Sequence, residues 1–542
     1  MQALRSLLLA ATFAACSLAP AAAQDTPKPQ APWVPDNGDG TYTNPVLHAD
    51  YSDPDVVAVD GDYWLTSSSF NCVPGLPILH SKDLVNWKLV GHALPKLYAP
   101  AFDRPQHGGG VWAPSIRYHD GWYYIYWGDP DRGIYMVRTT DPRGEWSEPV
   151  LVKKAYGNID PCPLWDDDGR VYMVHAFAHS RAGVKSLLQV VELNSEGTKI
   201  EDKGWIVFDG HAEHPTIEGP KFHKRNGYYY IFAPAGGVPT GWQTVLRSKN
   251  VRGPYEARIV MDQGNTEING PHQGAWIDTP DGESWFMHFQ DTGAYGRITH
   301  LQPMKWVDDW PVIGEDPDGD GNGQPVMVHA KPARAELANP ATSDDFSSSQ
   351  LGLQWQWHAN PRPEWYSLAA REGHLRLAAV PQPDDYRNLW DTPNLLLQKF
   401  PARSFEASCA LDIEHLEPGS RAGLLVMGNH YAYVGVERTT DGVQVVQRTC
   451  KGAERGTAES TSDARTIEAD QIELRVAVDA EAKCRFSYRT GAAKWTPIGA
   501  EFTAKEGKWI GAKVGLFCTT STPTDSASYV DVERFVVDRL AE

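Results

Sequence analysis

The segment Asp55-Val56-Val57-Ala58-Val59-Asp60-Gly61-Asp62-Tyr63-Trp64 joins an apolar run to an aromatic run through an Asp-Gly turn. This pattern is typical of a β-hairpin. It recurs at residues 115–124, 162–172, 221–230 and 275–286. The hairpins repeat with a period of about 50 residues, which indicates one four-stranded sheet per repeat. The sequence therefore predicts a five-bladed β-propeller, with turn glycines at Gly61, Gly121, Gly169, Gly227 and Gly282.

The rest of the chain also reads as β-structure, because helical periodicity is scarce. We expect an all-β protein with the propeller at 36–325, a linker at 326–342 and a second domain at 343–542. Short alternating strands in the second domain predict a β-sandwich of the jelly-roll, concanavalin-like type. The Asp- and Gly-rich run 316–323 resembles half of a calcium loop, but it lacks the Glu at the twelfth position, so a turn is favoured.

The first residues have the three parts of a secretory signal: Arg5, an apolar run at 7–15 and small residues up to Ala23. We therefore expect a signal peptide at 1–23 and a secreted or periplasmic protein. A lipoprotein anchored at Cys16 is the alternative. The apolar run is too short to span a bilayer, and no other stretch is long and apolar enough, so no membrane span is expected.

Charge and composition restrict the partners. The net charge of -19 repels nucleic acid and anionic membranes and suits a neutral substrate. Among 20 Trp and 22 Tyr, most should fill the core and some could stack on sugar rings. The cysteines after the signal are scattered without a CxxC pair, which disfavours a zinc site. Export permits disulfides among the four in the second domain, Cys409, Cys450, Cys484 and Cys518.

In each repeat, one position carries a side chain that could act in catalysis or ligand binding. It lies eight to ten residues before the turn glycine and holds three carboxyls, one Trp and one His. Equivalent positions of propeller blades point toward one central axis, so these side chains should converge. They are Asp53, Trp112, Asp160, Glu218 and His272.

The three carboxyls suit the hydrolysis of a glycosidic bond. Such a reaction needs a protonated acid at the leaving oxygen and a carboxylate acting on water or on the sugar. A third carboxylate would raise the pKa of the acid. Asp53 and Asp160 both precede Pro, which should hold them in extended backbone. Taken singly, Asp-Pro reads as a turn and Glu-Gly-Pro as a loop. Trp112 could be a sugar platform or blade packing, and His272 a metal or water ligand or a core histidine.

Short sequences between residues 44 and 303 occur in an order that carries a resemblance. They are Asn44-Pro45-Val46-Leu47, Asp53-Pro54, the run 77–87, Val111-Trp112-Ala113-Pro114, Ile159-Asp160-Pro161, Ile217-Glu218-Gly219-Pro220, Pro271-His272-Gln273-Gly274, Tyr295-Gly296-Arg297 and His300-Leu301-Gln302-Pro303. This set resembles glycoside hydrolase family 43. The tail from residue 343 resembles the concanavalin-like sandwich of β-xylosidase-type members.

The resemblance implies an inverting mechanism. Asp53 would be the general base, Glu218 the general acid, and Asp160 the residue that tunes the pKa of Glu218 and orients it. Phe70, Trp112, His272 and Arg297 match positions near the terminal sugar or an axial water. No cofactor is required, although in some relatives the axial His helps to hold calcium, so His272 could bind Ca²⁺ through water.

Two positions depart from many family members, which have Pro before the base and Ser two residues after it. This chain has Ser52 and Asp55. The departure leaves the substrate open more than the chemistry. We expect an exo-acting enzyme that releases α-L-arabinofuranosyl or β-D-xylosyl units from plant hemicellulose or arabinan oligosaccharides. The alternatives are a non-catalytic glycan-binding protein and a fructan hydrolase. The latter would need Arg-Asp-Pro in place of Ile159-Asp160-Pro161.

Overall fold

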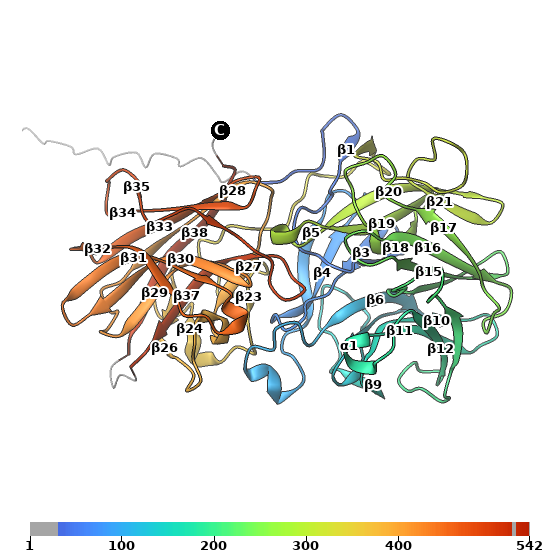
Figure 1. Ribbon diagram of the computed structural model, residues 1–542, viewed down its shortest axis with the longest axis horizontal. Helices are drawn as coiled ribbons and strands as arrows, with labels where there is room; N and C mark the ends of the chain where they lie inside the picture. The colour runs from blue at the N-terminus through green and yellow to red at the C-terminus, as the bar shows by residue number, and fades with distance from the viewer. Residues whose placement is uncertain (1–30, 523–526, 541–542) are drawn as a thin grey trace, which may run out of the picture.

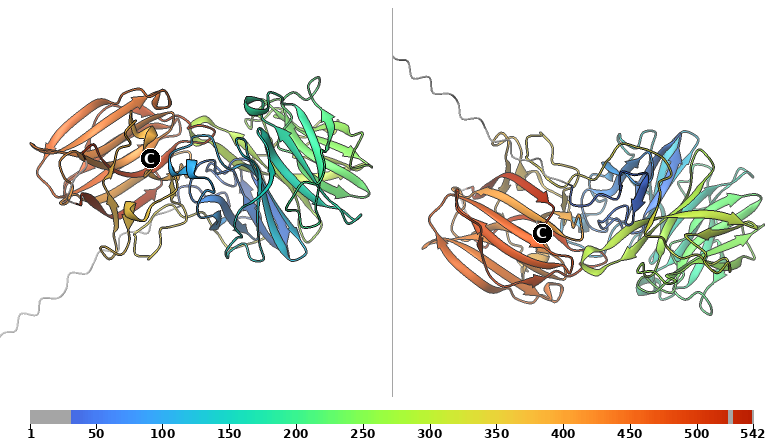
Figure 2. Two further views of the ribbon diagram at one scale, coloured as in Figure 1. Left: turned by 90° about the horizontal axis from the view of Figure 1, so that it is seen from below. Right: turned by 90° about the horizontal axis from the view of Figure 1, so that it is seen from above.

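The computed structural model describes residues 31–522 and 527–540, so the predicted signal peptide and Cys16 lie outside the described residues. Strands form nearly all of the regular structure, in two domains that lie side by side (Figures 1 and 2). In the described part of the chain, no helix has the length and apolarity needed to cross a membrane.

The first domain is the predicted five-bladed propeller. Each blade is an antiparallel sheet of four consecutive strands. Blade 1 contains β2 (Asp55–Val59), β3 (Asp62–Thr66), β4 (Gly75–Ser81) and β5 (Lys88–Leu94). Blade 2 contains β6 (Trp112–His119), β7 (Trp122–Asp129), β8 (Gly133–Thr139) and β9 (Val150–Lys154). Blade 3 contains β10 (Asn158–Trp165), β11 (Val171–Phe177), β12 (Leu187–Leu193) and β13 (Trp205–Asp209).

The last two blades repeat this order. Blade 4 contains β14 (Lys221–Arg225), β15 (Tyr228–Ala235), β16 (Trp242–Ser248) and β17 (Glu256–Met261). Blade 5 contains β18 (His272–Asp278), β19 (Ser284–Asp291), β20 (Arg297–Val307) and β21 (Trp310–Ile313). The short helices are η1 (Pro100–Asp103), α1 (His179–Ala182) and η2 (Gly293–Tyr295).

The hairpin turns form where the sequence predicts them. Asp60 and Gly61 have φ of +52° and +77°, so both central residues lie in the left-handed region, as a two-residue type I′ turn requires. Blades 2 and 4 repeat this geometry. The turn chemistry thus sets the first hairpin of the blade.

The ring of blades is closed by the segments that precede blade 1 and follow blade 5 in the sequence. β1 (Thr41–Thr43) pairs with β22 (Val328–Ala330), which lies within the segment predicted as a linker. The Asn44 amide donates to the carbonyls of Leu301 and Val326, each at 2.8 Å. The chain before blade 1 is thereby fixed to blade 5.

The second domain is a sandwich of two eight-stranded sheets around an apolar core. One sheet contains β23 (Gln356–Trp357), β26 (Val380–Pro381), β27 (Leu396–Lys399), β29 (Ser420–Met427), β30 (His430–Thr439), β31 (Gly442–Lys451), β32 (Ser460–Ile467) and β37 (Lys513–Thr520). The other contains β24 (Tyr366–Ser367), β25 (Leu375–Ala378), β28 (Phe405–Asp412), β33 (Gln471–Val478), β34 (Lys483–Arg489), β35 (Thr496–Pro497), β36 (Phe502–Thr503) and β38 (Tyr529–Asp538). Its short helices are η3 (Pro363–Trp365), η4 (Leu389–Asp391) and η5 (Ala453–Arg455).

The disulfides that export would permit in this domain are not formed. All six cysteines of the described chain are buried free thiols. They behave as small apolar residues of the strands, and burial raises the pKa of Cys450 to about 11.

The sandwich docks on two propeller connections. The connection between β3 and β4 pairs with the sandwich, because the Val73 N–H donates to the Trp357 carbonyl at 3.0 Å. The connection between β19 and β20 inserts Tyr295, whose hydroxyl oxygen lies 2.8 Å from the Arg403 carbonyl and 2.7 Å from the Asp479 carbonyl, within reach of both acceptors. The first connection carries Phe70, and the second leads directly into Arg297 at the start of β20, so domain docking reaches the candidate site.

Candidate active site

The five residues of the shared offset all lie at, or just before, the start of the first strand of a blade. Trp112 and His272 begin β6 and β18, Asp160 lies near the start of β10, and Asp53 and Glu218 lie shortly before β2 and β14. The register of the strand pairing breaks in three blades at this point, between Trp112 and Ser115, Ile159 and Cys162, and His272 and Gly274. These irregularities are β-bulges, which redirect side chains at the ends of strands.

The backbone at two of the acids differs from the expectation. Asp53 and Asp160 have φ of +54° and +56°, so the prediction that the following prolines hold them in extended backbone is wrong. A non-glycine residue in this region costs about 1–3 kcal/mol and is found where the surrounding structure fixes it. The bulge and its contacts therefore override the local preference that Pro imposes.

Asp53 receives hydrogen bonds from both sides. The Ser68 hydroxyl donates to Oδ2 at 2.5 Å, and the Arg297 Nη1 lies 3.1 Å from Oδ1 and 3.3 Å from Oδ2. Ser68 is itself held, since its oxygen accepts the Ala113 N–H at 2.7 Å. The Arg297 guanidinium also stands over the Phe289 ring, 4.9 Å from its centroid. Asp53 is thus a fixed acceptor surrounded by donors.

Glu218 lies beside the axial histidine. Its Oε1 is 3.6 Å from Nε2 of His272, and 31% of its side chain is exposed, whereas that of His272 is fully buried. Burial raises the pKa of Glu218 to about 7; Arg297 opposes the rise and the Asp53 charge adds to it. Burial, with Arg297, lowers the pKa of His272 to about 3, so this imidazole is neutral. Glu218 is therefore partly protonated at neutral pH.

Asp160 supports the backbone next to Glu218. Its Oδ2 accepts the N–H of Gly219 at 2.8 Å. Burial, followed by repulsion from Glu218, raises the pKa of Asp160 well above its ordinary value. Gly219 has φ of +59°, and a Cβ there would lie 2.5 Å from Cγ of Gln273, so the position requires glycine.

Aromatic side chains from both domains meet at one side of the site. The Phe70 and Trp112 rings are 6.2 Å apart between centroids, at 66° to one another. Trp509 of the sandwich lies 6.2 Å from Trp112, at 68°, and is 47% exposed. Such edge-to-face contacts leave ring faces free to receive a sugar. We call Phe70, Trp112 and Trp509 the aromatic wall.

The fit of His272 to a metal is limited. Both ring nitrogens are buried without a hydrogen-bond partner, so the ring can accept from water. Calcium, however, prefers several oxygen ligands. Within the described ranges, the acidic or histidine side chains that cluster closely enough to share an ion are Asp316, Asp318 and Asp320 of the predicted turn. A calcium held through water at His272 stays a prediction.

Asp55, which lies two residues after the predicted base Asp53, takes part in packing between blades. Asp55 is buried and accepts from Arg117 Nη1 at 2.6 Å and from the Ile116 N–H at 2.8 Å. It thereby joins blade 1 to blade 2 rather than entering the acid cluster.

Sequence reasoning missed three residues that shape this site. Ser68 stands in a run of serines that gives no reason to choose one of them. Asp50 accepts the Arg297 N–H at 2.9 Å through Oδ1 and the Gly511 N–H at 3.0 Å through Oδ2. Trp509 reaches the site only because the sandwich docks there. All seven predicted site residues lie at this end of the propeller axis.

Comparison with known proteins identifies relatives of both domains. Residues 42–311 match the sequence model of glycosyl hydrolases family 43, and residues 343–538 match that of the beta xylosidase C-terminal concanavalin A-like domain. A putative beta-xylosidase of Xylanibacter ruminicola is 39% identical over 487 residues, covering 89% of this chain and 87% of that protein. A beta-xylosidase of Formosa agariphila is 32% identical, covering 98% and 97%.

Other relatives carry a different activity in their names or supply a structure. A non-reducing end alpha-L-arabinofuranosidase of Bacteroides ovatus is 31% identical over 436 residues, covering 76% of this chain and 79% of that protein. The crystal structure of a family 43 protein of Bacillus licheniformis superposes with a TM-score of 0.80 at 26% identity, covering 92% of this chain and 100% of that one.

Proposed function

Because the chain belongs to glycosyl hydrolases family 43, and is thus a glycoside hydrolase, we propose that it is an inverting exo-glycosidase. Its substrates would be oligosaccharides of plant hemicellulose or arabinan that end in α-L-arabinofuranosyl or β-D-xylosyl units. The relatives named β-xylosidase and α-L-arabinofuranosidase support this range of pentoses. Neither a glycan-binding protein without activity nor a fructan hydrolase fits this membership.

The observation that carries the proposal is the contrast between Asp53 and Glu218. Asp53 accepts hydrogen bonds from a guanidinium and a hydroxyl, which suits a carboxylate that takes a proton from water. The pKa of Glu218 is raised to about 7, which suits an acid that gives one up. The two groups thus fit the base and the acid of a single displacement.

The proposed reaction follows from these two groups. Asp53 removes a proton from water as the water oxygen bonds to the anomeric carbon. The bond from that carbon to the leaving oxygen breaks on the opposite face, and Glu218 gives its proton to that oxygen. Asp160 acts by holding the peptide of Gly219 and so the position of Glu218. One displacement without a covalent intermediate inverts the anomeric configuration.

The exo mode is supported by the aromatic wall. Trp509 comes from the sandwich and stands beside Trp112 of the propeller, so a chain extending in both directions would meet a second domain. We propose that only a terminal sugar fits between this wall and the acids.

The test combines activity and stereochemistry. Nitrophenyl α-L-arabinofuranoside and nitrophenyl β-D-xyloside are incubated with the protein and with Asp53→Asn. The wild type should hydrolyse at least one of them, and the variant should be about 10²–10⁴-fold slower. Proton NMR of the first product should show the inverted anomer. Equal rates for the two proteins, or first release of the retained anomer, would contradict the proposal.

Export and metal independence complete the proposal. We propose that residues 1–23 are removed on secretion, which N-terminal sequencing of protein from periplasm or medium checks.

We also propose that hydrolysis needs no cofactor, because the acid and base are both supplied by the chain. Dialysis against a chelator should then leave the rate unchanged, whereas a loss restored by Ca²⁺ would contradict this part of the proposal.

A further inference from the structure

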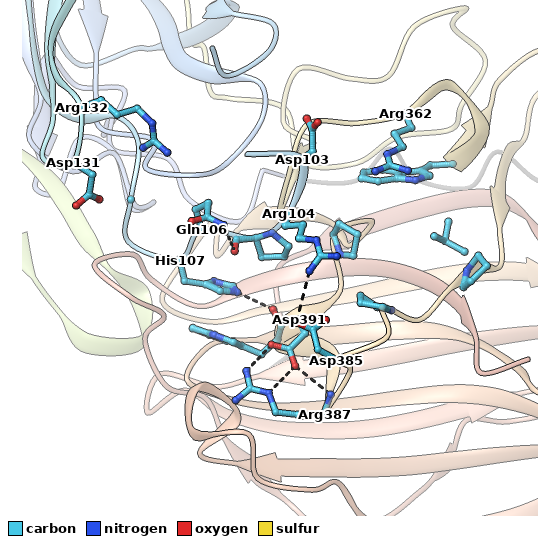
Figure 3. A pocket seen from close by; sticks show the side chains of 18 of the residues that line it. Asp103, Arg104, Gln106, His107, Asp131, Arg132, Arg362, Asp385, Arg387 and Asp391 are labelled. Atoms are coloured by element: carbon cyan, nitrogen blue, oxygen red, sulfur yellow. Dashed lines mark hydrogen bonds and ion pairs between the residues drawn. The ribbon is translucent and has the colours of Figure 1, made fainter. Parts of the chain in front are cut away.

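A polar cavity of about 810 Å³ lies between the propeller and the sandwich, beside the acid cluster (Figure 3). The propeller contributes residues 103–109, the turn that follows β7 and the helix α1 that follows β11, and the sandwich contributes residues between 362 and 393. Its volume is within the range of ligand pockets, roughly 300–1,000 Å³. None of the seven predicted site residues lines it.

The cavity opens on the same face of the propeller as the acids. Strands of a blade alternate in direction, so the turn after the second strand returns to the end where the first strand starts. Arg132 follows β7 and Arg181 follows β11, and both line the cavity. The Arg181 guanidinium carbon is 5.9 Å from the centroid of Trp112. The cavity therefore begins where the aromatic wall ends.

The loop that lines the cavity also supports that wall. Gly109 lines the cavity, and the neighbouring Gly108 carbonyl accepts the Trp112 Nε1–H at 2.9 Å. The Val111 N–H donates to the Phe70 carbonyl at 3.1 Å. A saccharide whose terminal unit lies against the wall would thus have its next units directed into the cavity.

The charge of the cavity is unusual for this protein. The chain has a net charge of -19, yet five arginines face four aspartates in the cavity lining. Three of the arginines have close carboxylate partners: Arg132 with Asp129 at 3.1 Å, Arg181 with Asp131 at 2.9 Å and Arg387 with Asp391 at 2.7 Å.

The remaining two arginines are Arg104 and Arg362. The closest carboxylate contact of Arg104 is 3.7 Å long, to Asp385. The Arg362 side chain is exposed, and among the described residues it has no hydrogen bond or ion pair. In Figure 3, Arg362 faces the cavity from the sandwich and Arg132 from the propeller. The lining thus presents one cation without a partner.

We propose that this cavity binds a uronic acid substituent of the oligosaccharide whose terminal pentose is hydrolysed, with the guanidinium of Arg362 receiving its carboxylate. This rests on the proposed function. A guanidinium binds a carboxylate through two parallel hydrogen bonds. The aspartates supply acceptors for sugar hydroxyls, and the buried Trp365 and the prolines of the lining supply apolar contact.

A small free anion fits these observations less well. It would fill a small part of a cavity of about 810 Å³ and would not use the connection to the aromatic wall. A uronic acid attached to the bound substrate uses both the volume of the cavity and its connection to the aromatic wall, because the terminal pentose fixes the uronic acid near the cavity.

The test compares two substrates that differ in one group. One is xylotriose, and the other is xylotriose with glucuronic acid on an internal unit. The ratio of kcat/KM, acidic over neutral, is measured for the wild type, for Arg362→Ala and for Arg362→Lys. Arg334→Ala, an exposed arginine of the chain between the domains, is the matched control. Binding of the acidic compound by calorimetry gives a readout that does not depend on hydrolysis.

The wild type should favour the acidic substrate by about fivefold, as one exposed but bidentate ion pair allows. Arg362→Ala should lose this preference, Arg362→Lys should keep part of it, and Arg334→Ala should retain it. The preference should fall with added salt. An unchanged ratio and unchanged binding in Arg362→Ala would overturn the proposal. Absence of pentoside hydrolysis in the wild type would instead overturn the proposed function, and the binding measurement would still decide the cavity.

Discussion

Asp50 of the propeller accepts a hydrogen bond from the backbone N–H of Gly511 in the sandwich, at 3.0 Å. Its other oxygen accepts the N–H of Arg297 at 2.9 Å, and the Arg297 side chain reaches Asp53. The approach is close, since a Cβ on Gly511 would lie 2.8 Å from the nitrogen of Gly296. The sandwich is therefore linked to the proposed base by one carboxylate and one arginine.

Asp50→Ala should weaken both the domain contact and the site. Two N–H groups lose their acceptor, at about 1–3 kcal/mol for each buried one left unpaired. Arg297 then loses its anchor, and small displacements of a positioning group cost about 10- to 100-fold in rate. Thermal unfolding and kcat/KM on a nitrophenyl pentoside measure the two effects.

The sandwich side of this contact offers a second variant. Gly511→Ala should produce the same pair of losses, because the added Cβ meets the backbone of Gly296. Glu468→Ala, at an exposed position of the sandwich, is the control and should change neither quantity. Full activity in Gly511→Ala would show that docking at this point does not position Arg297.

The raised pKa of Glu218 predicts the alkaline side of the pH profile. The proposed acid must be protonated, and burial raises its pKa to about 7, so kcat/KM should fall as pH rises through that value. Glu218→Gln should lose this dependence and be about 10²–10⁴-fold slower on oligosaccharides. The loss should be smaller with dinitrophenyl leaving groups, which need little protonation. A profile that stays flat up to pH 9 would argue against Glu218 as the acid.

The same group predicts a stability difference that depends on pH. The folded pKa of Glu218, about 7, exceeds its ordinary 4.5, so the folded state holds a proton that the unfolded state releases. The stabilisation of the folded state by this proton is fully present below pH of about 4.5 and is lost as the pH rises through about 7. Glu218→Gln, which stays neutral, should melt higher than the wild type at pH 8 and close to it at pH 4.5. A difference that does not change with pH would contradict the shift.

Local chemistry made the blades predictable from the sequence. A two-residue hairpin turn needs positive φ at its central positions, so pairs such as Asp60-Gly61 identify the hairpins directly. Once the hairpins are aligned, counting back from each turn reaches the same face of each blade. Asp53, Asp160 and Glu218 could therefore be grouped without any knowledge of their contacts.

Features that depend on tertiary contacts could not be predicted in this way. Asp-Pro indicates extended backbone, yet Asp53 and Asp160 adopt positive φ because bulges and hydrogen bonds fix them there. The partner of Asp53 on blade 5, Arg297, is 244 residues away. Trp509 lies in a turn of another domain, and only the docking of that domain brings it to Trp112.

Trp509→Ala tests whether the sandwich completes the site. Removing a ring that stands 6.2 Å from Trp112 should raise KM for pentosides by about 2- to 10-fold, the range of one aromatic contact, and leave kcat nearly unchanged. If the ring also blocks the passage of a longer chain, the variant should gain cleavage at internal linkages of xylohexaose. Trp122→Ala is the matched control, since Trp122 is similarly exposed at 37% but lies beside the hairpin turn at the opposite end of blade 2. Equal KM and product profiles for the two variants would mean that Trp509 only packs against Trp112.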